Sequence, residues 1–184
     1  LVAWIAIHVL GLEDILHYID DVFSYEMDPE LVLYPPYNKY MPRKQVSLLL
    51  LWDYIGVLHE ESQQVWGNSL EIIGFTVDLS AMTLTIPDKK RLDIIAAIRD
   101  FVDTSVSRSR PLRSWQRMLG WANWMLNAYP LLKPALRSSY AKISGKVIAH
   151  APVLLNKAVI RDLSWFADHL ALASCVRLLD ATIW

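Results

Sequence analysis

The sequence predicts an α+β fold, with short strands in the middle of the first half and helices through the second. Apolar, β-branched runs flank turn residues in the first half, whereas apolar residues recur at helical spacing in the second. Of the 184 residues, 54% are hydrophobic and 20% are charged, which suits a packed core and excludes a disordered chain. We expect two lobes that meet near residue 87.

The N-terminal part predicts a helix followed by a hairpin. The first ten residues form the end of an apolar helix that stops at Gly11. The β-prone runs 15–19 and 22–25 flank Asp20 and Asp21. This order predicts a tight hairpin with two carboxylates at its bend.

A loop, a helix and a second hairpin are predicted next. Residues 28–42 contain four prolines, so we expect no regular element there. Apolar residues at helical spacing predict a helix over 44–59. The runs 70–77 and 82–86 are apolar and β-branched, and the short link Asp78-Leu79-Ser80-Ala81 between them predicts the second hairpin.

Capping residues locate the first two helices of the second half. Pro87 and Asp88 begin a helix that extends to about Val102. A polar, basic loop follows, and Ser109 is expected to cap the next helix, with Pro111 in its first turn.

Two further helices and a strand are predicted near the C-terminus. Pro130 ends the preceding helix, and Pro134 starts a short helix that Gly145 closes. Asn156 caps a last long helix, and residues 176–183 are expected to begin a strand.

Charge is distributed unevenly along the chain. Residues 1–87 hold 3 Lys or Arg and 12 Asp or Glu, a net charge of −9, whereas residues 88–146 hold 12 basic and 4 acidic residues, a net charge of +8. One interpretation is a polyanion bound across both halves, with metal ions on the acidic side. The other is two solvated faces of opposite sign packed together, and charge alone favours the second.

Cysteine usage and apolar run lengths bear on the compartment. Cys175 is the single cysteine, which excludes a disulfide framework and suits a reducing interior, so we expect an intracellular protein of the cytoplasm or nucleus. The longest apolar runs, 1–7 and 46–52, fall short of the roughly 20 residues that cross a bilayer. The chain begins with Leu and has no basic n-region, so we expect no secretory signal, and the absent Met predicts a fragment of a longer protein.

The most informative motif is Tyr18-Ile19-Asp20-Asp21. A tight bend lets neighbouring carboxylates converge, and converging carboxylates are costly without a cation such as Mg²⁺. Paired Mg²⁺ ions held by carboxylates support in-line phosphoryl transfer. The alternative is an ordinary exposed turn, which is common.

Several stretches together resemble one family. Residues 18–21 look like the catalytic palm motif of reverse transcriptases, and residues 70–78 resemble the family's primer-grip hairpin. Residues 112–124 are similar to the thumb helix of reverse transcriptases from DIRS-like, tyrosine-recombinase retrotransposons, and 129–136 and 161–169 continue that match. The resemblance covers nearly the whole chain.

The resemblance implies a partial polymerase: the C-terminal part of the palm with the primer grip over 1–87, a helical thumb over 88–146, and a helical connection over 147–184 toward an absent RNase H domain. The parent enzyme would be an RNA-directed DNA polymerase that adds deoxynucleotides from their triphosphates to the primer of an RNA/DNA template-primer duplex, using two Mg²⁺ ions. Because the family's third metal-binding carboxylate and its fingers lie upstream, we expect the isolated chain to be inactive.

The resemblance also implies roles for single residues. Asp20 and Asp21 would be catalytic and metal-binding, and Tyr18 would pack near the primer end. Ile73, Gly74 and Phe75 would form the primer grip. Lys and Arg neutralise phosphates without reading sequence. The cations expected to contact the duplex are Arg108, Arg110, Arg113, Arg117, Lys133, Arg137, Lys142 and Lys146.

One departure from the family supports an alternative function. The family commonly places a lysine just before the primer grip, and residues 59–67 contain none. The alternative is a catalytically inactive remnant that acts as a helical module binding nucleic acid or a protein. The hydrophobic content of 54% fits apolar faces that absent parts once covered.

Overall fold

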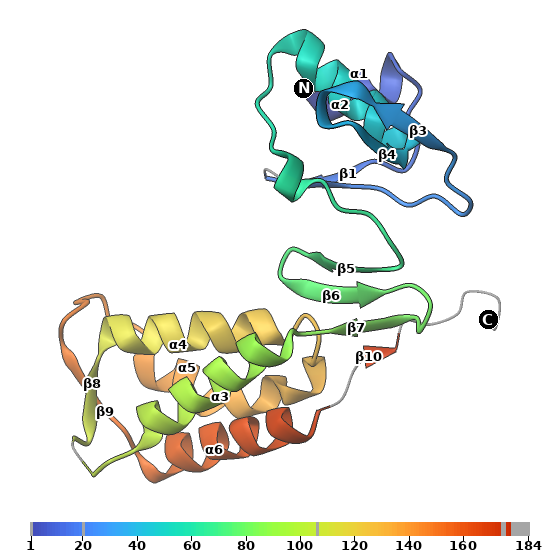
Figure 1. Ribbon diagram of the computed structural model, residues 1–184. Helices are drawn as coiled ribbons and strands as arrows, with labels where there is room; N and C mark the ends of the chain where they lie inside the picture. Colours follow the sequence, from blue (N-terminus) through green and yellow to red (C-terminus); the bar gives the residue numbers. More distant parts are fainter. Residues whose placement is uncertain (1, 20, 106, 174–175, 178–184) are drawn as a thin grey trace. The chain divides into compact units, whose positions relative to one another are not determined.

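The computed structural model describes residues 2–19, 21–105, 107–173 and 176–177. It divides into two compact units, Leu1–Ile73 and Gly74–Trp184 (Figure 1). The architecture is mixed helix and antiparallel sheet, which confirms the predicted α+β class. Within the described residues, the structure has no helix of the length and apolar character needed to cross a bilayer.

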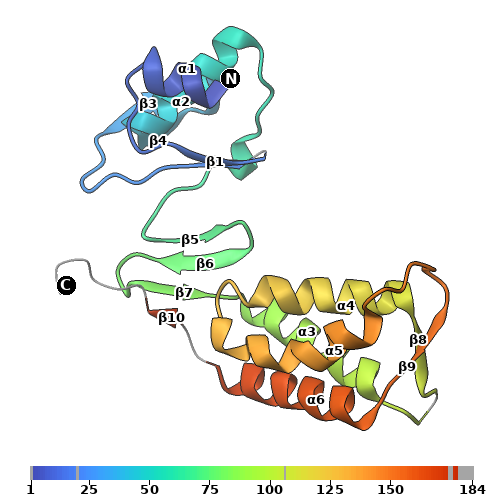
Figure 2. The ribbon, with the colours of Figure 1, turned by 180° about the vertical axis from the view of Figure 1, so that it is seen from behind.

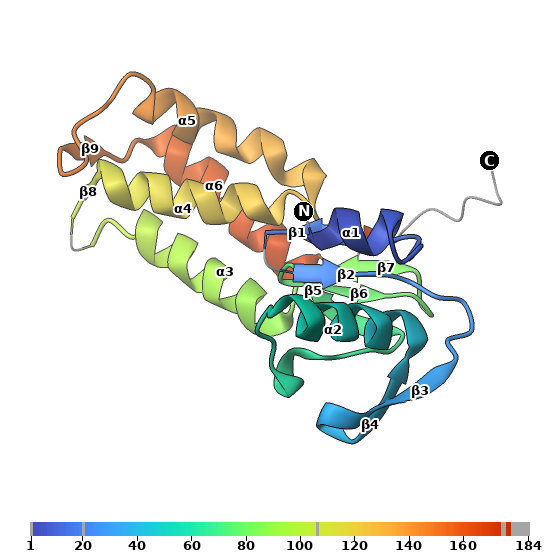
Figure 3. The ribbon, with the colours of Figure 1, turned by 90° about the horizontal axis from the view of Figure 1, so that it is seen from above.

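The first unit carries two hairpins and a central helix. Strands β1 (Leu16–Tyr18) and β2 (Asp21–Phe23) pair antiparallel with Tyr18 opposite Asp21, and β3 (Leu31–Tyr34) pairs with β4 (Lys39–Pro42). The β3–β4 hairpin leads directly into α2 (Arg43–Ile55), as Figure 3 shows. In chain order the elements are α1 (Val2–His8), β1 (Leu16–Tyr18), β2 (Asp21–Phe23), β3 (Leu31–Tyr34), the 3-10 turn η1 (Pro35–Tyr37), β4 (Lys39–Pro42), α2 (Arg43–Ile55), the 3-10 turn η2 (Glu61–Gln63) and β5 (Ser69–Ile72).

The β3–β4 hairpin corrects the prediction of a loop over 28–42. Pro35 and Pro36 lie in η1, where no strand partner needs their missing N–H groups. Asn38 then adopts a left-handed conformation with φ of 49° and directly precedes the return strand. Pro42 is the last residue of β4. Pro35, Pro36 and Pro42 therefore fall at the turn and at a strand end, positions that tolerate proline.

Helix α2 ends earlier than the sequence predicted. Gly56 adopts φ of 75° and caps the helix after Ile55, so His59 lies in the segment that follows rather than in the helix. The helix contributes to two small clusters of buried side chains. Val46 and Leu49 pack in one of them with the β3–β4 hairpin, and Leu51 packs in the other.

The second unit joins a group of helices to small sheets. Strand β7 (Thr83–Thr85) pairs with β6 (Phe75–Asp78) and with β10 (Val176–Arg177). Strand β8 (Ser109–Pro111) pairs with β9 (Pro152–Leu154) at the opposite end of the helices (Figures 1 and 2). In chain order the elements are β6 (Phe75–Asp78), β7 (Thr83–Thr85), α3 (Asp88–Val102), β8 (Ser109–Pro111), α4 (Leu112–Met125), the 3-10 segment η3 (Pro130–Leu136), α5 (Arg137–Ile143), β9 (Pro152–Leu154), α6 (Lys157–Leu172) and β10 (Val176–Arg177).

A single apolar core holds this unit together. It takes side chains from α3, α4, η3 and α6, with Ile143 of α5 packed against it, and Trp115 and Phe166 are among the largest that are fully buried. Full burial of a large apolar side chain contributes about 1.5–3 kcal/mol to stability. The core includes residues from both predicted helical regions, the thumb and the connection, so these two regions fold as one body.

Helix boundaries in this unit follow the sequence in part. The predicted cap is confirmed, because Asn156 Oδ1 accepts a hydrogen bond of 2.9 Å from the Val159 N–H. Ser109 is not a cap but lies in β8, and α4 begins after Pro111. The first N–H groups of α4 instead donate to backbone carbonyls of the loop before β9. Pro134 lies inside η3, and α5 begins only at Arg137.

The second predicted hairpin and the C-terminal strand are also confirmed in part. Residues 75–78 pair with 83–85 as predicted, but residues 69–72 form a separate strand that ends at a turn. The predicted strand over 176–183 is present at Val176 and Arg177, and its remaining residues lie outside the described part of the chain.

Candidate nucleic-acid interface

The β1–β2 hairpin presents its bend to solvent. Ile19 is 80% exposed and adopts a left-handed φ of 54°, which turns the chain between the strands. Tyr18 is 52% exposed, and Asp21, the first residue of β2, is also exposed. The predicted hairpin is confirmed, while Asp20 lies outside the described residues.

Of the two acidic residues at the bend, only Asp21 lies within the described residues, and its position suits cation binding. Its carboxylate is a hard oxygen donor at an accessible position, which fits the ligand preference of Mg²⁺. Across the described residues, no group of three or more His, Cys, Asp or Glu side chains gathers closely enough to hold a metal ion. Metal binding by Asp20 and Asp21 stays a prediction, because one member of the pair lies outside the described residues.

Ile73, Gly74 and Phe75 form the turn that leads into β6. Ile73 and Gly74 have φ of 51° and 83°, the paired left-handed conformations of a tight hairpin turn. A side chain added at Gly74 would lie 3.0 Å from Trp124 Cζ2, and the Phe75 ring stacks on Trp124 with centroids 4.5 Å apart. The predicted primer-grip residues Gly74 and Phe75 therefore pack against α4.

One face of α4 is cationic and aromatic. Arg113 and Arg117 are exposed one turn apart, and the Arg117 guanidinium lies 4.7 Å from the centroid of the Trp121 ring. No acidic residue occurs between Leu112 and Met125. This helix therefore offers positive charge and ring surface together, a combination that suits a phosphate-bearing ligand.

Gly120 is a residue that sequence reasoning missed. It lies in the interior of α4, where glycine costs about 1 kcal/mol relative to alanine. It is exposed, and a Cβ added there would have no neighbour within 4 Å. Helical spacing places it between Arg113 and Trp124 on one face. An exposed glycine in the middle of a charged helix face is the signal that could have identified it, because glycine leaves the helix backbone open to solvent there.

The other predicted cations are distributed over α5 and the loops. Arg108 precedes β8, Arg137 begins α5, and Lys142 lies in its last turn. Lys133 lies in η3, and Lys146 follows α5. Arg108, Arg137, Lys133 and Lys146 are exposed, and Lys142 is half-buried.

Arg110, which the sequence predicts to contact a nucleic-acid duplex, also has a structural role in a loop. Its guanidinium donates hydrogen bonds to the backbone carbonyls of Asp100, Asp103, Ser107 and Ser109, the shortest being 2.6 Å to Asp103. The same group lies 5.9 Å from the centroid of the Phe101 ring. These bonds fix the loop between α3 and β8, so Arg110 is committed to the fold. Sequence could not show this, because the acceptors are backbone atoms.

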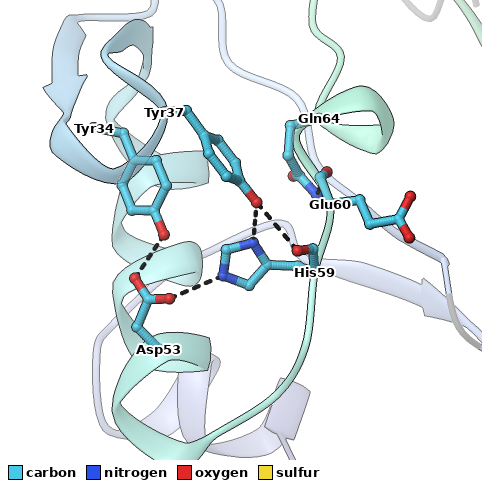
Figure 4. Close-up of polar contacts among 6 residues, drawn as sticks. All are labelled: Tyr34, Tyr37, Asp53, His59, Glu60 and Gln64. Atoms are coloured by element: carbon cyan, nitrogen blue, oxygen red, sulfur yellow. Dashed lines mark hydrogen bonds and ion pairs between the residues drawn. The ribbon is translucent and has the colours of Figure 1, made fainter.

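A polar network in the first unit was also missed (Figure 4). The Tyr34 hydroxyl donates to Asp53 Oδ2 at 2.6 Å, and His59 Nε2 lies 3.0 Å from Asp53 Oδ1. The Tyr37 hydroxyl contacts His59 Nδ1. The network joins the β3–β4 hairpin, α2 and the segment after it.

The network shifts the acid–base behaviour of its members. Burial, followed by the hydrogen bond to Asp53, raises the pKa of Tyr34 well above its ordinary range. Burial also raises the pKa of Tyr37. The Tyr34 hydrogen bond, with help from His59, holds the pKa of the Asp53 carboxyl below its ordinary value. The arrangement keeps Tyr34 neutral and Asp53 ionised, which is what a stabilising contact requires.

Comparison with known proteins gives fold similarity alone. No protein-family model matches the sequence, and no curated protein matches it. Two solved structures do: the foamy viral protease-reverse transcriptase in complex with RNA/DNA hybrid, with a TM-score of 0.61, and its dRH form in complex with double-stranded DNA, with a TM-score of 0.58. The fold is similar to part of a reverse transcriptase.

The alignments cover very different shares of this chain and of the viral chains. The alignments cover 97% of this chain, but only 21% and 27% of the viral chains, at 15% sequence identity. This chain therefore spans about a quarter of the length of the structures it matches. The expectation of a reverse-transcriptase-like α+β fold is confirmed, whereas kinship to DIRS-like retrotransposons stays a prediction.

Proposed function

We propose that this chain is the palm, primer-grip and thumb segment of an RNA-directed DNA polymerase from a DIRS-like retrotransposon. The observation that carries the proposal is the antiparallel β1–β2 hairpin, which carries Tyr18 and Asp21 beside its solvent-exposed bend. The fold similarity to a reverse transcriptase supports it. The proposed ligands are an RNA/DNA template-primer duplex and deoxynucleoside triphosphates, which the protein would meet in the cytoplasm or nucleus.

In this proposal Asp20 and Asp21 hold two Mg²⁺ ions, which would stabilise the charge that develops when a primer 3′ oxygen attacks the incoming nucleotide. Tyr18 packs near the primer end. The turn at Ile73, Gly74 and Phe75 positions the primer, because Phe75 is fixed by its stack on Trp124. These residues orient the primer rather than move protons.

The second unit grips the duplex by its backbone. Arg113 and Arg117 neutralise phosphates, and the bare backbone at Gly120 lets the duplex approach α4 closely. Arg108, Arg137 and Lys142 extend the cationic surface. Arg110 contributes by fixing the loop before β8.

Duplex binding is the direct test. We expect the chain to bind a labelled RNA/DNA duplex in a filter assay, with affinity that falls steeply between low and high salt. Changing Arg113→Glu together with Arg117→Glu should weaken binding and lower the slope of log affinity against log salt by about two. The matched control is Arg161→Glu, an arginine on α6 whose side chain is 77% exposed. Affinity that ignores salt contradicts the proposal.

Primer extension tests the catalytic part. The resemblance places the third metal-binding carboxylate outside these residues, so the purified chain with Mg²⁺ and nucleotides should give no template-dependent product. Extension by the chain alone would contradict the assignment of Asp20 and Asp21 as an incomplete site.

The second candidate is a nucleic-acid-binding remnant without catalysis. The observation in its favour is the segment 59–67, which lacks the family's lysine and whose first residue, His59, is engaged with Asp53. The sequence encoded upstream of residue 1 separates the two candidates. A strand ending in an aspartate with an aromatic residue nearby favours the polymerase, and an in-frame start without such a strand favours the remnant.

A further inference from the structure

A groove of about 520 Å³ opens in the second unit between the end of α4, the η3 segment and α5. Figure 3 shows α5 beside α4. The groove is lined largely by apolar side chains such as Leu131 and Pro134, and Leu131 is 87% exposed. Tyr140 lines it as well and is 45% exposed, so a ring surface is accessible from solvent.

The polar groups of the groove are all cationic or neutral. Lys133 and Arg137 lie in the lining with the amide of Asn123, and no carboxylate is present there. Within the part of the chain that the structure describes, neither cation forms a hydrogen bond or an ion pair. Two uncommitted positive charges beside an apolar, aromatic surface complement a ligand with a flat ring and a negative charge.

We propose that this groove binds one unpaired nucleotide, with its base against Tyr140 and its phosphate at Lys133 and Arg137. Stacking on an aromatic side chain tolerates any base, because every base has a π-face. An acidic peptide would satisfy the cations but would make no use of an exposed ring. The groove includes part of α4, the helix that carries Arg113 and Arg117, so this inference rests on the proposed function and extends it to unpaired strand.

The test uses the full chain and 2-aminopurine nucleoside 5′-monophosphate, whose fluorescence is quenched on stacking. We expect saturable quenching that weakens as salt rises. Tyr140→Ala should weaken binding about fivefold or more, because a stacked base is lost. Tyr140→Phe retains the ring and should bind as the unchanged chain does. Arg137→Glu should weaken binding, and Arg161→Glu, on the exposed face of α6, should not.

Three outcomes overturn the inference: no saturable quenching of the unchanged chain, equal binding by Tyr140→Ala and the unchanged chain, or full displacement of the probe by an equal concentration of inorganic phosphate. The last two would mean a cationic surface without a base site. Duplex binding is measured on the same samples. Nucleotide binding without duplex binding would support the nucleotide site in the groove and contradict the proposed function. Duplex binding without nucleotide binding would support the proposed function and contradict the nucleotide site.

Discussion

The two units of this chain are stabilised in different ways. In the first, buried apolar side chains form two small separate clusters, and a polar network of Tyr34, Tyr37, Asp53 and His59 joins the β3–β4 hairpin to α2. In the second, side chains from α3, α4, η3 and α6 form one continuous core. Small cores bury too little apolar surface to hold a chain alone, so the first unit depends on individual polar contacts and the second on packing.

The largest expected effect is in the core of the second unit. Trp115 is fully buried, and its ring meets Phe101 edge-on with centroids 5.1 Å apart. Trp115→Ala should lower the free energy of unfolding by about 3–5 kcal/mol, because it leaves a cavity. Denaturant titration followed by circular dichroism measures it. Trp165→Ala is the control, since Trp165 on α6 is 41% exposed, and a loss as large as that of Trp115→Ala would contradict the assigned core.

A smaller loss is expected from the polar network of the first unit. Asp53→Asn replaces the charged carboxylate that accepts a hydrogen bond from the Tyr34 hydroxyl and lies beside His59 Nε2. Because the Asp53 side chain is 43% exposed, solvent screens part of the effect, and we expect a loss of about 1 kcal/mol. Hydrogen exchange of β3 and β4 amides reports it. Asp28→Asn, an exposed position in the same unit, should leave these amides unchanged.

We expect the same network to make the stability of the first unit depend on pH in both the acidic and the alkaline range. The pKa of Asp53 is lowered from an ordinary value of 3.8, so its contribution is present above that value and is lost as pH falls through the lower folded pKa. The pKa of Tyr34 is raised from an ordinary value of 10.0, so its contribution is present below pH 10 and is lost as pH rises through the higher folded pKa.

Amide exchange in β3 and β4 should therefore accelerate in strong acid and strong alkali beyond its intrinsic pH dependence. Tyr34→Phe should remove the alkaline part and also reduce the acid part, because the Tyr34 hydrogen bond is the main cause of the lowered Asp53 pKa. Asp53→Asn should remove the acid part and reduce the alkaline part, because Asp53 helps to raise the pKa of Tyr34. If both variants keep the full pH dependence, the network does not control the stability of this unit.

The smallest expected effect has opposite signs for folding and binding. Gly120→Ala should raise the free energy of unfolding by up to about 1 kcal/mol, because alanine favours helix and the added methyl group has no neighbour within 4 Å. The same change should weaken RNA/DNA duplex binding by obstructing close approach to α4. Thermal unfolding and the filter assay measure the two effects on one preparation, and unchanged affinity would remove Gly120 from the interface.

Much of the fold could be predicted because its signals are local. The bounds of α3 and the start of α6 follow from apolar spacing with Pro87 and Asn156 at their starts, and the β1–β2 hairpin follows from β-prone runs around a turn. Proline content alone does not predict the β3–β4 hairpin, because the position of Pro35 and Pro36 at its turn is what makes them compatible with the strands. Part of the candidate site, at Tyr18 and Asp21, could likewise be located from one short motif.

The sequence by itself determined the helical spacing, the capping of α6 and the placement of Tyr18 and Asp21 beside a turn, since each depends on neighbours a few residues away. Only the tertiary structure decided that Arg110 serves the loop before β8, that Gly120 lies bare on α4, and that Tyr34 meets Asp53. Tyr34 and Asp53 are 19 residues apart, and Arg110 reaches a carbonyl 10 residues away. Contacts of that range depend on how elements pack, which residue patterns within one element do not encode.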